Sequence, residues 1–170
     1  MKNAISTIAA GWALAGGVLL LVITLVTTFN VGAFTLDRIG RTIGAAPVEG
    51  FAGYEDLVRL LISCAALMFF PYCQLRRGHV AVDLFTDRFP AALRDALNRL
   101  WLAATAFLAL FLGYWMTIGL FETRADATST SILGWVEWPF YIPGIVSMAL
   151  WAVIAAMQAF EPAEGELRGA

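Results

Sequence analysis

The sequence predicts an all-α membrane protein with four transmembrane helices and an amphipathic interfacial helix in a central cytoplasmic loop. Of the 170 residues, 60% are hydrophobic and only 14% are charged, whereas soluble domains are about 45–50% apolar and about 25% charged. Four apolar runs are long enough to cross a hydrocarbon core of ~30 Å at 1.5 Å per residue. Apart from Arg59, near the start of the second run, the charged residues lie between these runs and outside them.

The four apolar runs cover about residues 8–29, 57–75, 100–121 and 138–160. The first run is too long for the apolar region of a signal peptide and ends without a cleavage site, so we expect it to be retained as a span. Pro71 should kink or end the second helix. No internal repeat or second domain is evident, so residues 1–170 are expected to form a single membrane domain.

The lysines and arginines predict the orientation. With the N-terminus inside, the inner side holds Lys2, Arg76, Arg77, Arg88, Arg94, Arg99 and Arg168. The outer side then holds Arg38, Arg41, Arg59 and Arg124. Because cytoplasmic loops carry an excess of basic residues, this distribution places both termini in the cytoplasm.

The second half of the central segment has the pattern of an amphipathic helix. Pro90 suits the first helical turn, where its missing N–H costs nothing. Phe89, Leu93 and Leu97 recur at helical spacing, and polar residues such as Arg94 occupy the other side. Such a helix can lie in the membrane interface with its arginines among the headgroups.

His79 and Asp83, in the first half of this segment, are four residues apart and would share a face if the stretch is helical. We interpret them as structural: Asp83 caps or bridges within the loop, and His79 donates to a backbone carbonyl. A docking surface for another subunit and a proton relay or ion site are the alternatives. A relay inside the bilayer should have more than one ionisable partner.

Glu55 and Arg59 open the second span, four residues apart and in the order that favours an ion pair on a helix. We expect an interfacial pair there, with contact to a partner protein as the alternative. At the start of the fourth span, Trp135, Trp138 and Tyr141 are expected to form an aromatic belt at one membrane surface.

The sequence offers no machinery for catalysis. A single histidine cannot supply bis-histidine haem ligation, and Cys64 and Cys73 would lie on opposite faces of one helix, too far apart for a disulfide. No Walker, HExxH, GxSxG or GxGxxG sequence occurs. With a net charge of −2 there is no basic excess for a nucleic acid. We therefore expect a membrane subunit that is not an enzyme and has no cofactor, metal or nucleic-acid partner.

Three features follow one another along the chain in an order that resembles a known family. They are the acidic pair Glu55-Asp56, the stretch Arg76-Arg77-Gly78-His79-Val80-Ala81-Val82-Asp83, and Leu133-Gly134-Trp135 followed by Pro139 and Pro143. Together with four spans, they resemble the small membrane subunit of tripartite ATP-independent periplasmic (TRAP) transporters, a family often named for C4-dicarboxylate uptake. The similarity extends over about residues 26–160.

The resemblance implies a fixed scaffold subunit of a sodium-driven, binding-protein-dependent importer of an organic acid, in the bacterial inner membrane. The implied partners are a large membrane permease subunit, a periplasmic substrate-binding protein and membrane lipids. The alternatives are a small four-span subunit of another tripartite carboxylate transporter, which should lack the Gly-His-x-x-Val-Asp stretch, and a non-transport membrane anchor. The candidate subunit-interface or structural motif comprises Glu55, Arg59, Arg76, Arg77, Gly78, His79 and Asp83.

Overall fold

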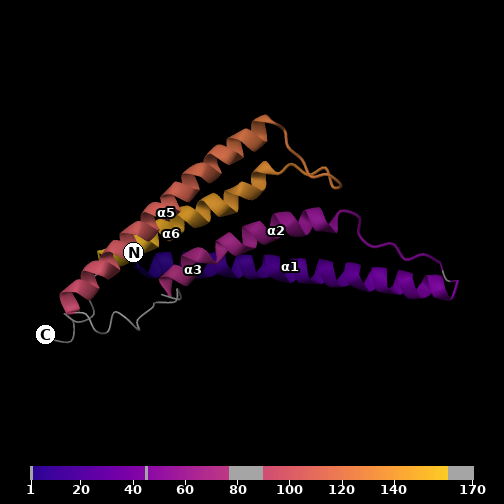
Figure 1. Ribbon diagram of the computed structural model, residues 1–170, viewed down its shortest axis with the longest axis horizontal. Helices are drawn as coiled ribbons and strands as arrows, with labels where there is room; N and C mark the ends of the chain where they lie inside the picture. Colours follow the sequence, from indigo (N-terminus) through magenta and orange to yellow (C-terminus); the bar gives the residue numbers. More distant parts are fainter. Residues whose placement is uncertain (1, 45, 77–89, 161–170) are drawn as a thin grey trace.

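The computed structural model describes residues 2–44, 46–76 and 90–160, and this part of the chain is almost entirely helical (Figure 1). Its elements are α1 (Lys2–Thr42), α2 (Tyr54–Met68), α3 (Phe70–Leu75), α5 (Ala91–Ala125), the 3₁₀ helix η1 (Trp138–Tyr141) and α6 (Ile142–Ala159). Four of these helical stretches are long and apolar enough to cross a membrane. The predicted fold class, an all-α protein with four spans, is confirmed.

The first span belongs to a much longer helix than its apolar run indicated. The membrane-crossing candidate runs over Asn3–Thr42, which is ~60 Å of helix at 1.5 Å per residue. Nothing in residues 30–42 breaks a helix, although the hydropathy falls after Asn30. The helix ends only before Gly44, which takes a left-handed conformation (φ 71°) that glycine adopts at low cost.

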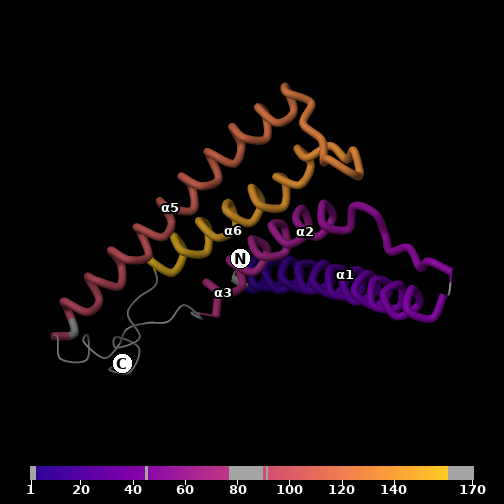
Figure 2. Tube along the Cα trace, turned by 45° about the vertical axis from the view of Figure 1, so that its right-hand side comes forward, coloured from indigo at the N-terminus to yellow at the C-terminus, as the bar shows by residue number. Residues whose placement is uncertain are grey.

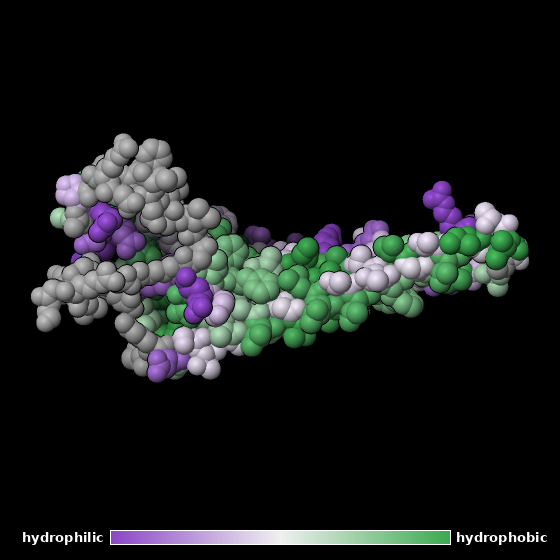
Figure 3. All heavy atoms as spheres, turned by 90° about the horizontal axis from the view of Figure 1, so that it is seen from below, coloured by the Kyte–Doolittle hydropathy of each residue, from purple (hydrophilic) through white to green (hydrophobic). Residues whose placement is uncertain are grey.

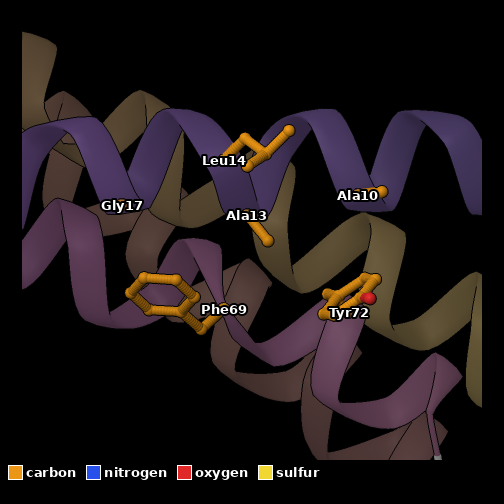
Figure 4. Close-up of a pocket in the computed structure, with 6 residues that line it drawn as sticks. All are labelled: Ala10, Ala13, Leu14, Gly17, Phe69 and Tyr72. Carbon is orange, nitrogen blue, oxygen red and sulfur yellow. The ribbon is translucent and has the colours of Figure 1, made fainter.

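The second span is broken where the sequence predicted a kink. α2 ends at Met68 and α3 begins at Phe70, one residue before Pro71. Proline has no N–H to donate to the preceding turn, so the helical hydrogen bonding is interrupted here. This break turns the aromatic side chains of Phe69 and Tyr72 toward α1, beside a groove (Figure 4).

The helix expected to begin at Pro90 begins at Ala91, but it continues without interruption to Ala125. Its first turns are therefore the beginning of α5 and of the third span. The described residues contain no separate interfacial helix. Residues 77–89, which form the rest of the central loop, lie outside the described part of the chain.

The helices lie side by side in one layer, in the order α1, α2 with α3, α6 and α5 (Figures 1 and 2). α6 packs on α5, α2 and α3, whereas α1 packs on α2 and α3. The pair α1–α2 and the pair α5–α6 diverge toward the end where α1 and α5 finish, and we name this end the outer end, following the predicted orientation. On the face shown in Figure 3, hydrophobic residues cover most of the length.

The centre of the layer is a small apolar cluster between α5 and α6. Its buried members are Ala109, Met148, Trp151 and Ala152, and Leu67, Phe70 and Met116 pack against it. Lipid tails are as apolar as these side chains, so close van der Waals packing must hold the helices together. Small residues allow this close packing: a Cβ atom built on Gly113 would lie 3.3 Å from Cβ of Met148.

Buried polar side chains tie the inner halves of α3 and α6 together. The indole Nε1 of Trp151 donates to Oε1 of Gln74 at 3.1 Å. Nε2 of Gln74 donates to Oε1 of Gln158 at 2.7 Å, and Nε2 of Gln158 donates to the carbonyl of Gln74 at 3.1 Å. Interhelical hydrogen bonds of this kind contribute ~0.6–2 kcal/mol each in membranes.

A second polar contact connects α1 to α6. Nε1 of Trp12 donates to Oγ of Ser147 at 2.8 Å, and that hydroxyl donates in turn to the carbonyl of Pro143 at 2.7 Å. In the described part of the chain, no buried side-chain nitrogen or oxygen is without a hydrogen-bond partner.

Gly16 allows the closest approach of α1 to α2. Its Cβ, if present, would lie 3.1 Å from Cβ of Met68 and 3.3 Å from the carbonyl oxygen of Ala65. Gly16→Leu should therefore force the two helices apart and cost about 1–3 kcal/mol, the usual penalty of overpacking. The measurement is the midpoint of thermal unfolding in detergent. Gly32→Leu is the control, because a Cβ on Gly32 meets nothing within 4 Å. Equal midpoints for the two variants would contradict the packing of α1 on α2.

Candidate functional site at the outer end of the helices

The structure does not gather the motif residues into one site. Glu55 and Arg59 lie in the first turns of α2 at the outer end, whereas Arg76 follows α3 at the inner end. The intervening helical residues correspond to ~30 Å at 1.5 Å per residue. Arg77, Gly78, His79 and Asp83 lie outside the described residues, so their roles remain as the sequence predicted them.

Arg59 makes its ion pair with a residue that the sequence did not indicate. Its Nη2 lies 2.8 Å from Oε1 of Glu137, in the connection before η1. Glu55, the expected partner, is exposed and forms no ion pair among the described residues. The expected Glu55–Arg59 pair is therefore wrong. The connection brings the carboxylate of Glu137, of whose side chain only 22% is exposed, within reach of Arg59.

Asp56 joins α2 to the segment between α5 and α6. Its Oδ2 accepts hydrogen bonds from the backbone N–H groups of Ile132 (2.9 Å) and Leu133 (3.3 Å). Its position in the first turn of α2 also suits the positive end of the helix dipole. The acidic pair was visible in the sequence, but its partners are two backbone groups more than 70 residues away, which no sequence pattern indicates.

Gly53 permits this contact because it is the residue before α2 and lies against Leu133. A Cβ on Gly53 would be 2.8 Å from Cγ of Leu133, a distance that real side chains do not reach. Gly53 also has a φ of 83°, in the left-handed region that favours glycine. Any other residue here would push the connection away from α2.

The connection itself is a tight hairpin over residues 128–137. The N–H of Thr130 donates to the carbonyl of Trp135 at 2.9 Å, and the N–H of Trp135 donates to Oγ1 of Thr130 at 3.1 Å. Gly134 supplies the positive φ of 66° at the turn. The hairpin presents three exposed apolar side chains outward: Ile132, Trp135 and Val136.

The aromatic residues of the expected belt have different neighbours. Trp135 is exposed on the hairpin, whereas Trp138 is half-buried and lies under the guanidinium of Arg124, 5.2 Å from its ring centroid. A cation over a tryptophan ring is an attractive arrangement. Tyr141 packs its ring against Gly119 of α5.

The outer end also carries exposed carboxylates. Glu55, Glu122 and Asp126 are exposed, and none of them forms an ion pair among the described residues. These carboxylates, the exposed Arg124 beside two of them and the apolar tip of the hairpin all lie at the outer end, and we call them together the outer surface. Such a surface can contact another protein. The described residues contain no group of three or more His, Cys, Asp or Glu placed to hold a metal ion, and Cys64 and Cys73 are both free.

Removing the Asp56 carboxylate should loosen the hairpin. In Asp56→Ala, the N–H groups of Ile132 and Leu133 lose their acceptor, so we expect a lower unfolding midpoint and faster limited proteolysis within residues 128–137. Glu55→Ala is the matched control, because its carboxylate has no bonded partner in the described residues. If both variants are cleaved at the wild-type rate, Asp56 does not hold the hairpin.

The comparison with protein families agrees with these features. The family model described as "Tripartite ATP-independent periplasmic transporters, DctQ component" matches residues 30–165. The match covers most of the chain, including the second, third and fourth spans and the hairpin. Comparisons with curated proteins and with solved structures each found no significant match. The chain belongs to the DctQ component family and is a small membrane subunit of a tripartite ATP-independent periplasmic transporter.

Proposed function

We propose that this subunit is the stationary scaffold of a sodium-driven importer of an organic acid, such as a C4-dicarboxylate or a related carboxylate. Its partners are a large permease subunit that carries the substrate, a periplasmic binding protein and membrane lipids. The complex lies in the bacterial inner membrane, with both termini of this subunit in the cytoplasm. The observation that supports this role best is the arrangement of the four spans as a single layer.

A single layer of helices encloses no path of its own. Ionisable residues that form transport paths face the interior of a helix bundle or a water-filled cavity. Among the described residues, the helices pack mainly on their neighbours within the layer, and the Trp12–Ser147 bond is a further contact between α1 and α6. Substrate selection and ion coupling therefore belong to the partner subunits.

The distribution of polar groups supports the same conclusion. In the described residues, the charged side chains of α1, α2 and α5 lie toward the helix ends, and α6 has none. The polar side chains nearer the middle, such as Ser147 and Asn30, are bonded within the chain: Oδ1 of Asn30 accepts from the N–H of Phe51 at 2.7 Å. Among the described residues, the buried polar side chains of the spans are thus already bonded within the chain.

The exposed surface of α5 suits a subunit that is embedded among lipids and other subunits. Only 6% of its most hydrophobic 18-residue stretch is buried within the chain. Phe107, Phe111 and Trp115 form a row of exposed aromatic rings, with successive centroids 6.4 and 6.3 Å apart. Four spans with so much apolar surface give strong anchorage, which a stationary part needs if it is to resist movement of the permease beside it.

The outer surface is the part of this subunit that a periplasmic binding protein can reach. Its hairpin is held by Asp56 and by the Arg59–Glu137 pair, so its apolar tip is presented in a fixed position. A fixed surface loses less conformational entropy on binding than a mobile loop. The family match disfavours the alternatives of another tripartite carboxylate system and of a non-transport anchor.

The orientation can be measured with reporter fusions that are active only in the periplasm. A fusion after Gly44 should be active, because it follows the first span, and a fusion after Ala170 should be silent. The reverse pattern would show that the Arg-rich central loop faces outward, and the outer end described here would then be the cytoplasmic end.

The scaffold role requires that the subunit alone transports nothing. In liposomes with an imposed sodium gradient, the chain alone should take up labelled C4-dicarboxylates no faster than empty vesicles do. Addition of the large subunit and the binding protein should produce uptake if the transported acid is among the labelled C4-dicarboxylates. A panel of other labelled carboxylates tests further substrates. Saturable uptake by the isolated chain would disprove the scaffold role.

A further inference from the structure

A groove lies between α1 and the α2–α3 junction (Figure 4). Its volume is about 460 Å³. It is lined by Ala10, Ala13, Leu14, Gly17, Phe69 and Tyr72. The lining is almost wholly apolar, and none of these residues belongs to the outer surface or to the sequence motif.

The groove exists because small residues face large ones across a helix break. On α1, Ala13 and Gly17 leave the helix surface hollow, and Phe69 and Tyr72 form the opposite wall beside Pro71. The space ends abruptly along α1. A Cβ on Gly16 would touch Met68 at 3.1 Å, whereas a Cβ on Gly17 would meet nothing within 4 Å. The groove therefore begins where the tight contact between α1 and α2 stops.

The two ends of the groove differ in polarity. Gly17 and Phe69 lie at the end toward the middle of the layer, and Ala10 and Tyr72 lie at the end toward the inner side (Figure 4). The hydroxyl of Tyr72 is the polar atom at that end. One turn further on, the N–H of Arg76 donates to the carbonyl of Tyr72 at 3.0 Å. The side chain of Arg76 is exposed and forms no ion pair among the described residues.

We propose that this groove binds one acyl chain of an inner-leaflet phospholipid, whose phosphate is held by Arg76. An apolar slot that ends near a tyrosine hydroxyl, with the exposed side chain of Arg76 one turn further along the helix, has the same order of groups as a lipid, with its tail, interfacial region and phosphate. Guanidinium groups bind phosphate well, and basic positions beside transmembrane helices on the cytoplasmic side bind lipid headgroups. The bound chain would fill the gap between α1 and α3 and couple α1 to the leaflet.

The size of the groove favours a lipid chain over a helix of another subunit. From Ala10 to Gly17 the groove follows α1 for ~10 Å at 1.5 Å per residue. A volume of about 460 Å³ over this length gives a section of ~45 Å². A helix with side chains is ~10–12 Å across, or roughly 80–110 Å² in section. A helix would therefore rest on the rim and leave the groove unfilled.

Photolabelling can test this proposal without any measurement of uptake, so its outcome is independent of the transport role. The full chain is placed in nanodiscs of phosphatidylcholine that contain phosphatidylglycerol with a diazirine at the middle of one acyl chain. After illumination, labelled peptides are identified by mass spectrometry. We expect label to concentrate on residues 10–17 and 69–72, above the level on the lipid-exposed residues of α5. Equal labelling of the two regions would overturn the proposal.

Two variants of α1 provide a matched comparison. A Cβ on Gly17 meets nothing within 4 Å, so Gly17→Leu places its side chain in the groove. Labelling of residues 69–72 should then fall to the level of α5 while the unfolding midpoint stays unchanged. Gly11→Leu adds the same side chain to the same helix outside the groove, where a Cβ also meets nothing within 4 Å, and labelling should persist. Equal loss, or equal retention, in both variants would contradict a chain bound in the groove.

The headgroup and the large subunit are tested separately. Arg76→Gln should reduce the excess label from phosphatidylglycerol, and unchanged labelling would overturn the placement of the phosphate. The wild-type experiment is then repeated on the complex with the large membrane subunit. Persistent labelling supports a resident lipid. Labelling that is present in the chain alone and absent in the complex would show that a helix of the large subunit occupies the groove.

Discussion

The packing of α6 against α5 on one side and against α2 and α3 on the other is the contact on which the whole layer depends. Inside a bilayer the hydrophobic effect does not draw helices together, so the backbones must approach closely enough for dispersion and interhelical hydrogen bonds to act. Gly113 and Gly144 allow this approach, since a Cβ on Gly144 would collide with the side chains of Met116 and Leu67. α1 joins the layer through α2, α3 and the Trp12–Ser147 bond.

The two helix pairs diverge toward the outer end, and the hairpin joins them there. At the outer end, α2 and α5 are separated, and the connection between α5 and α6 extends across toward the start of α2 (Figures 1 and 2). Asp56 binds the hairpin backbone and Arg59 binds Glu137, so the two pairs are joined again outside the apolar region. Charged hydrogen bonds at this end and the glutamine–tryptophan contacts at the inner end hold the helices together at both ends of the layer.

The acidic pair illustrates why the site was only partly predictable. The sequence indicated that Glu55, Asp56 and Arg59 are important at the start of α2, and the structure places two of the three in contact with the hairpin. The sequence could not indicate which carboxylate is bonded. Helical spacing pairs Glu55 with Arg59 and carries no information about a connection far along the chain. Burial of Glu137 and the free N–H groups of Ile132 and Leu133 decided the outcome. The predicted roles of His79 and Asp83 stay predictions.

The sequence by itself determined the membrane class, the number of spans, the break at Pro71 and the family, because composition, apolar run length and short motifs are local properties of the chain. Only the tertiary structure decided how far α1 and α5 extend, that the spans form one layer, and which groups Asp56 and Arg59 contact. Helix ends depend on the next residue that stops a helix, such as Gly44, whereas hydropathy reports only the apolar part. Contacts between distant segments depend on helix packing, which local pattern does not encode.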